Sequence, residues 1–261
     1  MNSRAQAWPY PRWIAHRGAG KLAPENTLAA FRVGAQHGFR MFECDAKLSA
    51  DGVPFLLHDA SLGRTSNAAA LWAKASGSDV SAVAGEHAWS RLAQLDAGSW
   101  HSPGFAGEPL PTLANIARYC LLNGYALNIE IKPTPGTERL TGAVVAQHAA
   151  RLWQGAEVPP LLSSFAPEAL AAAQAAAPHL PRALLLDHLP PDWLDIALQL
   201  ACVAIVCKHS LWNARTVQQA RGAGFKSLSY TVNDTVEAQR LEALGTDGII
   251  TDRVDVFSSQ L

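Results

Sequence analysis

Cysteine is scarce in this chain of 261 residues, and its four copies, Cys44, Cys120, Cys202 and Cys207, follow no pattern. They form no CxxC pair and no dense framework, which excludes a small disulfide-stapled scaffold. We therefore expect reduced and mostly buried thiols, as in a cytosolic protein.

Charge and long apolar runs are also sparse. Only 16% of the residues are charged, and 21 basic side chains nearly balance 22 acidic ones. Such a balance gives no electrostatic field for nucleic acid or a membrane surface, so any anion site must be local. The stretch Met1 to Trp13 has no apolar region of signal-peptide length, and no run approaches the roughly 18 residues of a membrane span. We expect a cytoplasmic protein with neither nucleic acid nor membrane as a partner.

Short apolar runs alternate with helical periodicity along most of the sequence. The runs predict strands at 13–15, 41–48, 126–131, 160–163, 182–186, 203–207, 227–232 and 248–251. Helices are predicted between them at 27–37, 113–122, 140–153, 167–177, 193–200, 214–223 and 235–244. Eight strands alternating with these helices and a final one after 251 favour, in this length, a single (β/α)₈ barrel domain over 1–261. A doubly wound sheet is disfavoured because residues 16–20 after the first strand lack the GxGxxG fingerprint.

The alternation of strands and helices is interrupted after the second strand. A further extended segment at 54–57 follows the turn at Asp51-Gly52, and residues from 60 to about 111 are rich in Ala, Gly and Ser. This region reads as an insertion, with one short helix expected around 89–95.

Polar side chains gather where the first three strands end, which in a barrel is where working residues lie. His16 and Arg17 follow the first strand. Glu43 and Asp45 stand two positions apart in the second, so they share one face, while Cys44 faces the helix layer. The sequence Asn128-Ile129-Glu130-Ile131-Lys132 repeats this spacing on the third strand.

Three carboxylates on adjacent strands, Glu43, Asp45 and Glu130, would repel one another strongly without a cation. Hard oxygen ligands suit Mg²⁺, Ca²⁺ or Mn²⁺. The alternative is a set of salt bridges to Arg17 and Lys132. A guanidinium and an ammonium beside a divalent ion would suit an anionic phosphate.

His16 and His58 are candidates for an acid/base pair, because imidazole titrates near neutral pH. The structural alternatives are a core His16 bonded to a carbonyl group and a strand-end His58 paired with Asp59. Asp252 is interpreted as a cap of the final helix.

Two aromatic side chains are candidates for binding substrate. Tyr230, together with Phe165, either lines a pocket at the barrel mouth or plugs the core. Trp100 either closes over the site or packs the insertion.

These residues belong to a series of motifs that resembles the glycerophosphodiester phosphodiesterases. The motifs are Ala-His-Arg-Gly, Ala-Pro-Glu-Asn-Thr, Glu-x-Asp, Leu-His-Asp, Arg-Thr, Leu-Asp-Ala-Gly-Ser-Trp, Pro-Thr-Leu, Asn-Ile-Glu-Ile-Lys, Ser-Ser-Phe, Tyr-Thr-Val-Asn and Asp-Gly-Ile-Ile-Thr-Asp, in family order from 15 to 252. Segments 8–11, 20–24, 161–165 and 184–187 are similar to the bacterial cytoplasmic members associated with glycerol-3-phosphate uptake. Gly63, Asn115 and Tyr230 depart from residues common in the family.

The resemblance implies a barrel with a small insertion and one divalent cation, expected to be Mg²⁺ with Ca²⁺ and Mn²⁺ as alternatives, on the three carboxylates. It implies His16 and His58 as the acid/base pair, with Arg17 and Lys132 on the phosphoryl oxygens. The implied reaction releases glycerol 3-phosphate and an alcohol from a glycerophosphodiester, in a monomer or homodimer. A lipid-directed phospholipase on the same barrel and a non-catalytic binder of a phosphorylated ligand are the alternatives.

Overall fold

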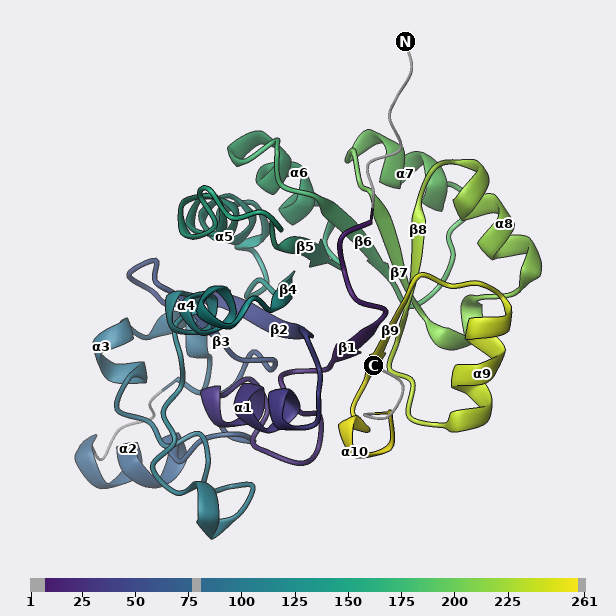
Figure 1. The fold of residues 1–261 in the computed structure, drawn as a ribbon. Helices are drawn as coiled ribbons and strands as arrows, with labels where there is room; N and C mark the ends of the chain where they lie inside the picture. The colour runs from purple at the N-terminus through teal and green to yellow at the C-terminus, as the bar shows by residue number, and fades with distance from the viewer. Residues whose placement is uncertain (1–7, 77–80, 258–261) are drawn as a thin grey trace.

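The strands form one closed barrel (Figure 1). The computed structural model describes residues 8–76 and 81–257. It does not describe residues 1–7, 77–80 and 258–261. Part of the 1–13 stretch, in which no signal peptide was expected, and part of the expected insertion therefore lie outside the described residues. Within the described ranges, the parallel barrel strands are β1 (Trp13–Ala15), β2 (Met41–Leu48), β4 (Ala126–Ile131), β5 (Leu161–Ser164), β6 (Arg182–Leu186), β7 (Ala204–Lys208), β8 (Lys226–Tyr230) and β9 (Gly248–Thr251). Strand β1 pairs with both β2 and β9, which closes the barrel, so the predicted (β/α)₈ fold is confirmed.

Helices cover the outside of the barrel and connect its strands. They are α1 (Leu28–Gln36), α4 (Leu113–Asn123), α5 (Glu138–Leu152), α6 (Pro167–Ala176), α7 (Trp193–Gln199), α8 (Ala214–Gly222) and α9 (Thr235–Ala243), and the short α10 (Val254–Phe257) follows β9. Their boundaries follow local chemistry. Thr27 caps α1 through its side chain, and Thr112 forms a reciprocal capping box with Asn115 on α4. Gly124, in the left-handed region at φ 67°, ends α4.

Alternation along each strand separates two cores. One face of each strand fills the barrel interior with side chains such as Ile14, Leu185 and Ile250. The opposite face packs against the helices and includes Cys44, as expected. Glu43 and Asp45, on either side of Cys44 in β2, therefore face the interior. All four cysteines are buried and free.

Helices α5 and α6 approach very closely. A Cβ atom at Gly142 would lie 2.1 Å from the carbonyl oxygen of Ala169, so a larger residue there would push the two helices apart. No helix in the described ranges is long and apolar enough to cross a membrane.

The excursion after β2 begins with β3 (Pro54–Leu56), which pairs antiparallel with β2. It continues through α2 (Ala68–Ser76), η1 (Ala84–Glu86), α3 (Trp89–Leu92) and η2 (Pro103–Phe105). This region has its own small core, which includes Phe55, Leu62, Trp72 and Leu92. The expected helix near residue 89 is present but shorter than predicted, and α2 was not predicted.

Candidate active site

The loop between β1 and α1 has an unusual backbone. Arg17 (φ 50°) and Asn26 (φ 60°) both adopt left-handed conformations, which non-glycine residues rarely adopt and which cost about 1–3 kcal/mol each. Tight packing holds the loop from both sides. A Cβ atom at Gly20 would lie 2.2 Å from the Asp252 backbone, and one at Gly34 in α1 would lie 2.1 Å from the Gly18 carbonyl oxygen. The loop that carries His16 and Arg17 is thus clamped between α1 and the segment after β9.

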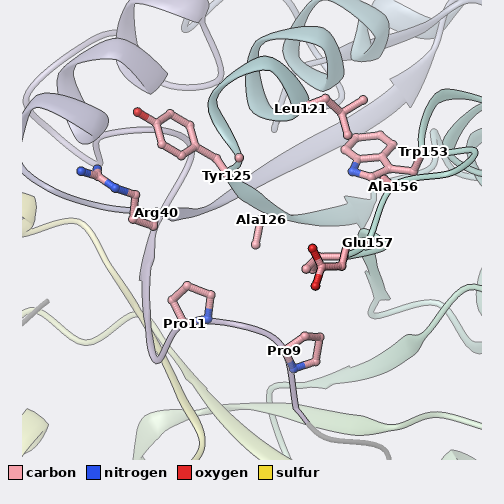
Figure 2. Close-up of a pocket in the computed structure, with 11 residues that line it drawn as sticks. Pro9, Pro11, Arg40, Leu121, Tyr125, Ala126, Trp153, Ala156 and Glu157 are labelled. Carbon is pink, nitrogen blue, oxygen red and sulfur yellow. The ribbon is translucent and has the colours of Figure 1, made fainter.

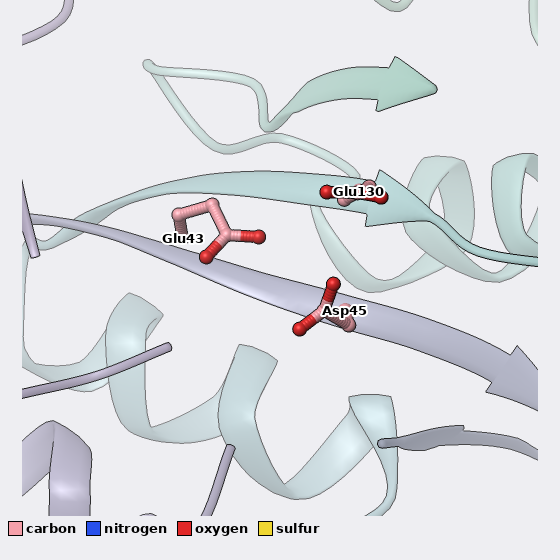
Figure 3. A group of neighbouring side chains, drawn as sticks. All are labelled: Glu43, Asp45 and Glu130. Carbon is pink, nitrogen blue, oxygen red and sulfur yellow. The ribbon is translucent and has the colours of Figure 1, made fainter. Parts of the chain in front are cut away.

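Glu43, Asp45 and Glu130 point toward one another from β2 and β4 (Figure 3). One oxygen atom from each lies within 4.8 Å of the other two. Glu43 Oε1 and Asp45 Oδ1 are buried and have no hydrogen-bond partner. Burial and the charge of Asp45 raise the pKa of Glu43 to about 8, and the same two causes raise the pKa of Glu130. These oxygen atoms, which accept no hydrogen bond, fit a hard divalent cation, whose charge would relieve the repulsion.

Asp45 differs from the two glutamates. Burial alone would raise its pKa, but Arg17 and Lys132 outweigh burial and hold the pKa at about 2. Arg17 Nε lies 3.2 Å from Asp45 Oδ2, and Lys132 Nζ lies 3.5 Å from Asp45 Oδ1. Asn26 donates to Asp45 Oδ2 at 2.8 Å. The salt bridges that the sequence offered as the alternative to a metal ion are therefore present, beside a carboxylate cluster that could still hold one.

Lysine and arginine side chains surround the cluster. Lys132 Nζ donates to Glu130 Oε1 at 2.9 Å, and the buried Lys47 donates to the Lys132 carbonyl oxygen at 3.1 Å. The polar network holds six carboxylates (Glu25, Glu43, Asp45, Asp59, Glu130 and Asp252) and four cationic side chains (Arg17, Lys47, Arg64 and Lys132).

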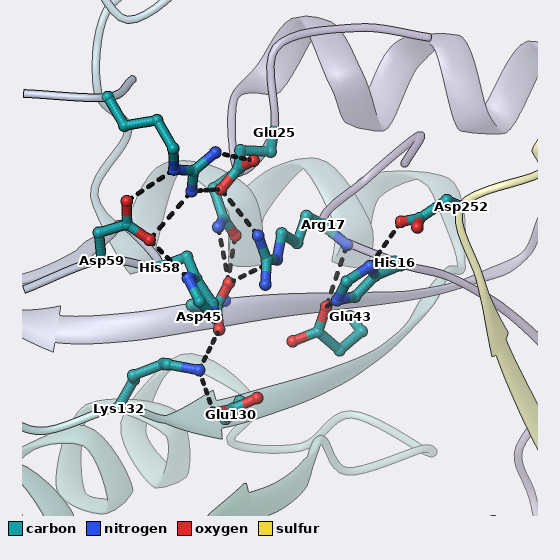
Figure 4. Close-up of polar contacts among 12 residues, drawn as sticks. His16, Arg17, Glu25, Glu43, Asp45, His58, Asp59, Glu130, Lys132 and Asp252 are labelled. Carbon is teal, nitrogen blue, oxygen red and sulfur yellow. Dashed lines mark hydrogen bonds and ion pairs between the residues drawn. The ribbon is translucent and has the colours of Figure 1, made fainter. Parts of the chain in front are cut away.

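Both candidate histidines are held by a carboxylate on Nδ1 (Figure 4). His16 Nδ1 lies 2.6 Å from Asp252 Oδ1, and His58 Nδ1 lies 2.7 Å from Asp59 Oδ1. Because a carboxylate accepts, it favours the tautomer with the proton on Nδ1 and leaves Nε2 for the site. His16 Nε2 lies 3.9 Å from Glu43 Oε2.

Their surroundings shift the two pKa values in opposite directions. Burial lowers the pKa of His16, but the Asp252 hydrogen bond and the Glu43 charge outweigh it, so the net direction is upward. Burial lowers the pKa of His58, and the attraction of Asp45 does not overcome it.

The interpretation of Asp252 as a helix cap is wrong. Its Oδ1 faces His16, and its Oδ2 accepts from the Asn233 side chain at 2.9 Å. Asp252 follows β9 and His16 follows β1, and the parallel pairing of these strands brings the two side chains together. Only the shared family motifs near 230–233 and 247–252 could have signalled this partnership.

A cavity of about 30 Å³ lies inside the barrel mouth. It is lined by His16, Glu43, Asn128, Glu130, Phe165, Leu185, Tyr230 and Ile250. A groove of about 230 Å³ adjoins it over the ends of β4 and β5, and shares Glu130 and Phe165 with it. Tyr230 stands at right angles to Phe165 and donates its hydroxyl to the Leu186 carbonyl oxygen at 3.1 Å. Asn128 therefore lies on the interior face, as expected, and Tyr230 lines the cavity, while its contact with substrate stays a prediction.

Trp100 does not line this cavity or the adjoining groove among the described residues. Its indole N–H donates to the Ala97 carbonyl oxygen at 2.8 Å, and its ring meets His101 edge-on. His101 Nε2 in turn lies 3.0 Å from the Lys21 carbonyl oxygen in the β1–α1 loop. The contact of Trp100 with substrate stays a prediction.

A larger cavity of about 400 Å³ lies elsewhere (Figure 2). Its lining includes Pro9, Pro11, Arg40, Tyr125 and Trp153, close to where β2 and β4 begin. It therefore opens at the amino ends of the strands, whereas barrel enzymes work at the carboxyl ends.

The fold and the site define a (β/α)₈-barrel enzyme with an acidic, metal-type centre at the carboxyl ends of its strands. Residues 16–256 match the model of the Glycerophosphoryl diester phosphodiesterase family, and the chain belongs to that family. It is therefore a phosphoric diester hydrolase, and the predicted family and enzyme class are confirmed.

Individual relatives agree over nearly the full length. A phosphodiesterase from Oleispira antarctica, solved in complex with the product sn-glycerol-3-phosphate, is 32% identical with a TM-score of 0.84, covering 96% of each chain. The glycerophosphodiester phosphodiesterase of Caldanaerobacter subterraneus subsp. tengcongensis is 29% identical, covering 92% of this chain and 93% of that protein. The structure of the Agrobacterium tumefaciens str. C58 glycerophosphodiester phosphodiesterase is 26% identical with a TM-score of 0.74, covering 95% and 99%.

Proposed function

We propose that the protein hydrolyses glycerophosphodiesters to glycerol 3-phosphate and an alcohol such as choline, ethanolamine or glycerol. The observation that carries this proposal is the meeting of His16 and His58, each held by a carboxylate, with the three acids of β2 and β4. The Oleispira antarctica relative, solved with sn-glycerol-3-phosphate as product, supports the choice of substrate class.

Glu43, Asp45 and Glu130 would hold one divalent cation, for which we propose Mg²⁺, with Ca²⁺ and Mn²⁺ as alternatives. The fit rests on Glu43 Oε1 and Asp45 Oδ1, which are buried and accept no hydrogen bond, and on the raised pKa of both glutamates. When bound, the cation would offset negative charge on the phosphoryl group.

Arg17 and Lys132 bind the non-bridging phosphoryl oxygens in this proposal. Both lie beside Asp45, and Arg17 is pre-set by its ion pair with Glu25 at 2.9 Å. Fixed donors of this kind stabilise the transition state because no reorganisation is needed when charge develops. Tyr230, on the cavity wall, and Trp100, in the insertion, contact the rest of the substrate.

His16 and His58 move the protons. One imidazole removes a proton from the attacking oxygen through Nε2 as the new P–O bond forms. The other, which must start as the imidazolium, donates its proton to the leaving alkoxide as the old P–O bond breaks, so each step takes up one proton and gives up one. Two nucleophiles fit this pair: water, and the glycerol 2-hydroxyl, which gives a cyclic phosphate that is hydrolysed afterwards.

The test is an assay of glycerol 3-phosphate release from several glycerophosphodiesters, with EDTA treatment and metals added back one at a time. Release that EDTA abolishes and Mg²⁺ restores supports the proposal, and no release with any divalent cation refutes it. Faster turnover of lysophosphatidylcholine than of glycerophosphocholine would favour the lipid-directed alternative instead. Hydrolysis of an analogue without the 2-hydroxyl requires direct attack by water.

A further inference from the structure

Arg64 lies at the start of the insertion, outside the lining of the cavity, and uses both edges of its guanidinium group. Nε and Nη2 donate to the two oxygens of Asp59 at 2.6 and 3.0 Å. Nη1 and Nη2 donate to the two oxygens of Glu25 at 2.8 and 2.7 Å. One side chain thus makes two bidentate contacts, the strongest geometry available to an arginine–carboxylate pair.

Each of these carboxylates also holds one proposed site residue (Figure 4). Asp59 Oδ1 accepts from His58 Nδ1 at 2.7 Å, and Glu25 Oε1 accepts from Arg17 Nη1 at 2.9 Å. Asp59 Oδ1 and Glu25 Oε1, which accept these two bonds, are also the oxygen atoms that Arg64 Nη2 contacts.

We propose that Arg64 is a positioning residue that fixes His58 and Arg17 at the same time, by holding Asp59 and Glu25 between its two edges. It links the insertion to the β1–α1 loop, where Arg17 keeps an unfavourable backbone conformation. Without the guanidinium, Asp59 would lose two of its three hydrogen bonds and Glu25 two of its three, and both would be free to rotate. A displacement of about 1 Å in a reacting group can cost 10²-fold in rate.

Lysine is not an adequate substitute at this position. Its ammonium group is a single point with no planar fork, so it would hold one carboxylate well and the other poorly. Arg64→Lys is therefore expected to keep part of the activity, whereas Arg64→Ala loses more.

This inference rests on the function proposed above, so wild-type turnover of glycerophosphocholine is measured first. An inactive wild type with every divalent cation refutes the function, whereas an active wild type makes the Arg64 test independent of it. Arg64→Ala is expected to lower kcat at least tenfold with a smaller change in KM and an unchanged circular-dichroism spectrum. Methylguanidinium is expected to restore part of the loss in Arg64→Ala. Arg12→Ala removes a similarly exposed arginine from a surface ion pair with Glu242 and is expected to keep wild-type turnover.

A double-mutant cycle separates positioning from a general structural effect. Arg64→Ala is combined in turn with Asp59→Asn and with Glu25→Gln. If Arg64 acts through these carboxylates, its removal costs much less in either background than in the wild type. Wild-type turnover in Arg64→Ala overturns the proposal. So do additive losses in both cycles, or a loss that methylguanidinium does not reverse at all.

Discussion

Asp252 Oδ1 lies 2.6 Å from His16 Nδ1, although the two residues are 236 positions apart along the chain. The carboxylate orients the imidazole and favours the tautomer that presents Nε2 to the site. An amide in its place can donate to Nδ1 and so favour the opposite tautomer. This relationship leads to the first prediction.

Asp252→Asn is expected to lower kcat by about 10²-fold, because a misoriented imidazole transfers protons poorly. Steady-state kinetics with glycerophosphocholine measure the change. Asp255→Asn is the matched control, since Asp255 pairs with Arg253 on the surface close by. Equal kinetics for Asp252→Asn and the control would show that the carboxylate does not act through His16.

His16→Ala and His58→Ala are each expected to lower kcat by at least about 10²-fold, with the fold retained. Removal of either ring takes away one of the two proton transfers. Turnover is compared with that of His179→Ala, which changes an exposed histidine. Near-wild-type turnover in either variant would remove that histidine from the mechanism.

Metal binding is expected to raise the thermal stability of the wild type. A cation at 100 times its Kd adds about 2.7 kcal/mol to the free energy of unfolding, which is roughly 5–10 °C in Tm for a chain of this size. Glu130→Gln should lose most of this gain, and its Tm without metal should be no lower than that of the wild type, because one of three repelling carboxylates is gone. Calorimetry with and without Mg²⁺ measures both effects.

The exposed Glu157→Gln variant is the control for metal binding and should keep the full gain in Tm. A Glu130→Gln variant with the same gain as the wild type would place the cation away from β4.

The Glu237–Arg240 pair predicts a pH effect on stability, far in sequence from the acidic cluster. Arg240 donates to both oxygens of Glu237, and this contact, helped by His209 and opposed by burial, lowers the pKa of Glu237 to about 2. A lowered carboxylate pKa stabilises the fold fully above the unfolded-state value near 4.5, and the gain is lost as the pH falls toward 2. Glu237→Gln should therefore cost on the order of 1 kcal/mol at pH 7, after allowance for solvent screening.

Urea unfolding of the wild type and Glu237→Gln from pH 7 to pH 3 measures this effect. The difference in unfolding free energy should be constant down to about pH 5 and shrink below it. A difference that grows as the pH falls would contradict the assigned direction.

Local patterns were enough to predict most of the fold. Alternation in 41–48 and 126–131 placed Glu43, Asp45 and Glu130 on the interior face, because a strand turns successive side chains to opposite sides. Helix α2 escaped prediction because its sequence, Ala-Ala-Ala-Leu-Trp-Ala-Lys-Ala-Ser, lies in a stretch rich in Ala, Gly and Ser that was interpreted as an insertion without a strand–helix repeat.

Contacts between distant segments could not be predicted from such local patterns. The partner of His16 depends on how β1 and β9 pair, and local spacing suggested a helix cap for Asp252 instead. Arg64 was visible only as part of an Arg-Thr motif, because its bond to Glu25, 39 positions away, joins segments that meet only in the folded molecule.

The pairing of β1 with β9 has a consequence for protein synthesis. Asp252 lies 236 positions after His16, so it is added to the nascent chain much later. A nascent chain whose β9 has not yet left the ribosome cannot close the barrel, and its His16 has no carboxylate to orient it. Premature termination upstream of β9 would thus yield a polypeptide with most of its strands but an unfinished active site. Catalytic activity is therefore a sensitive readout of synthesis through β9 and of barrel closure in this protein.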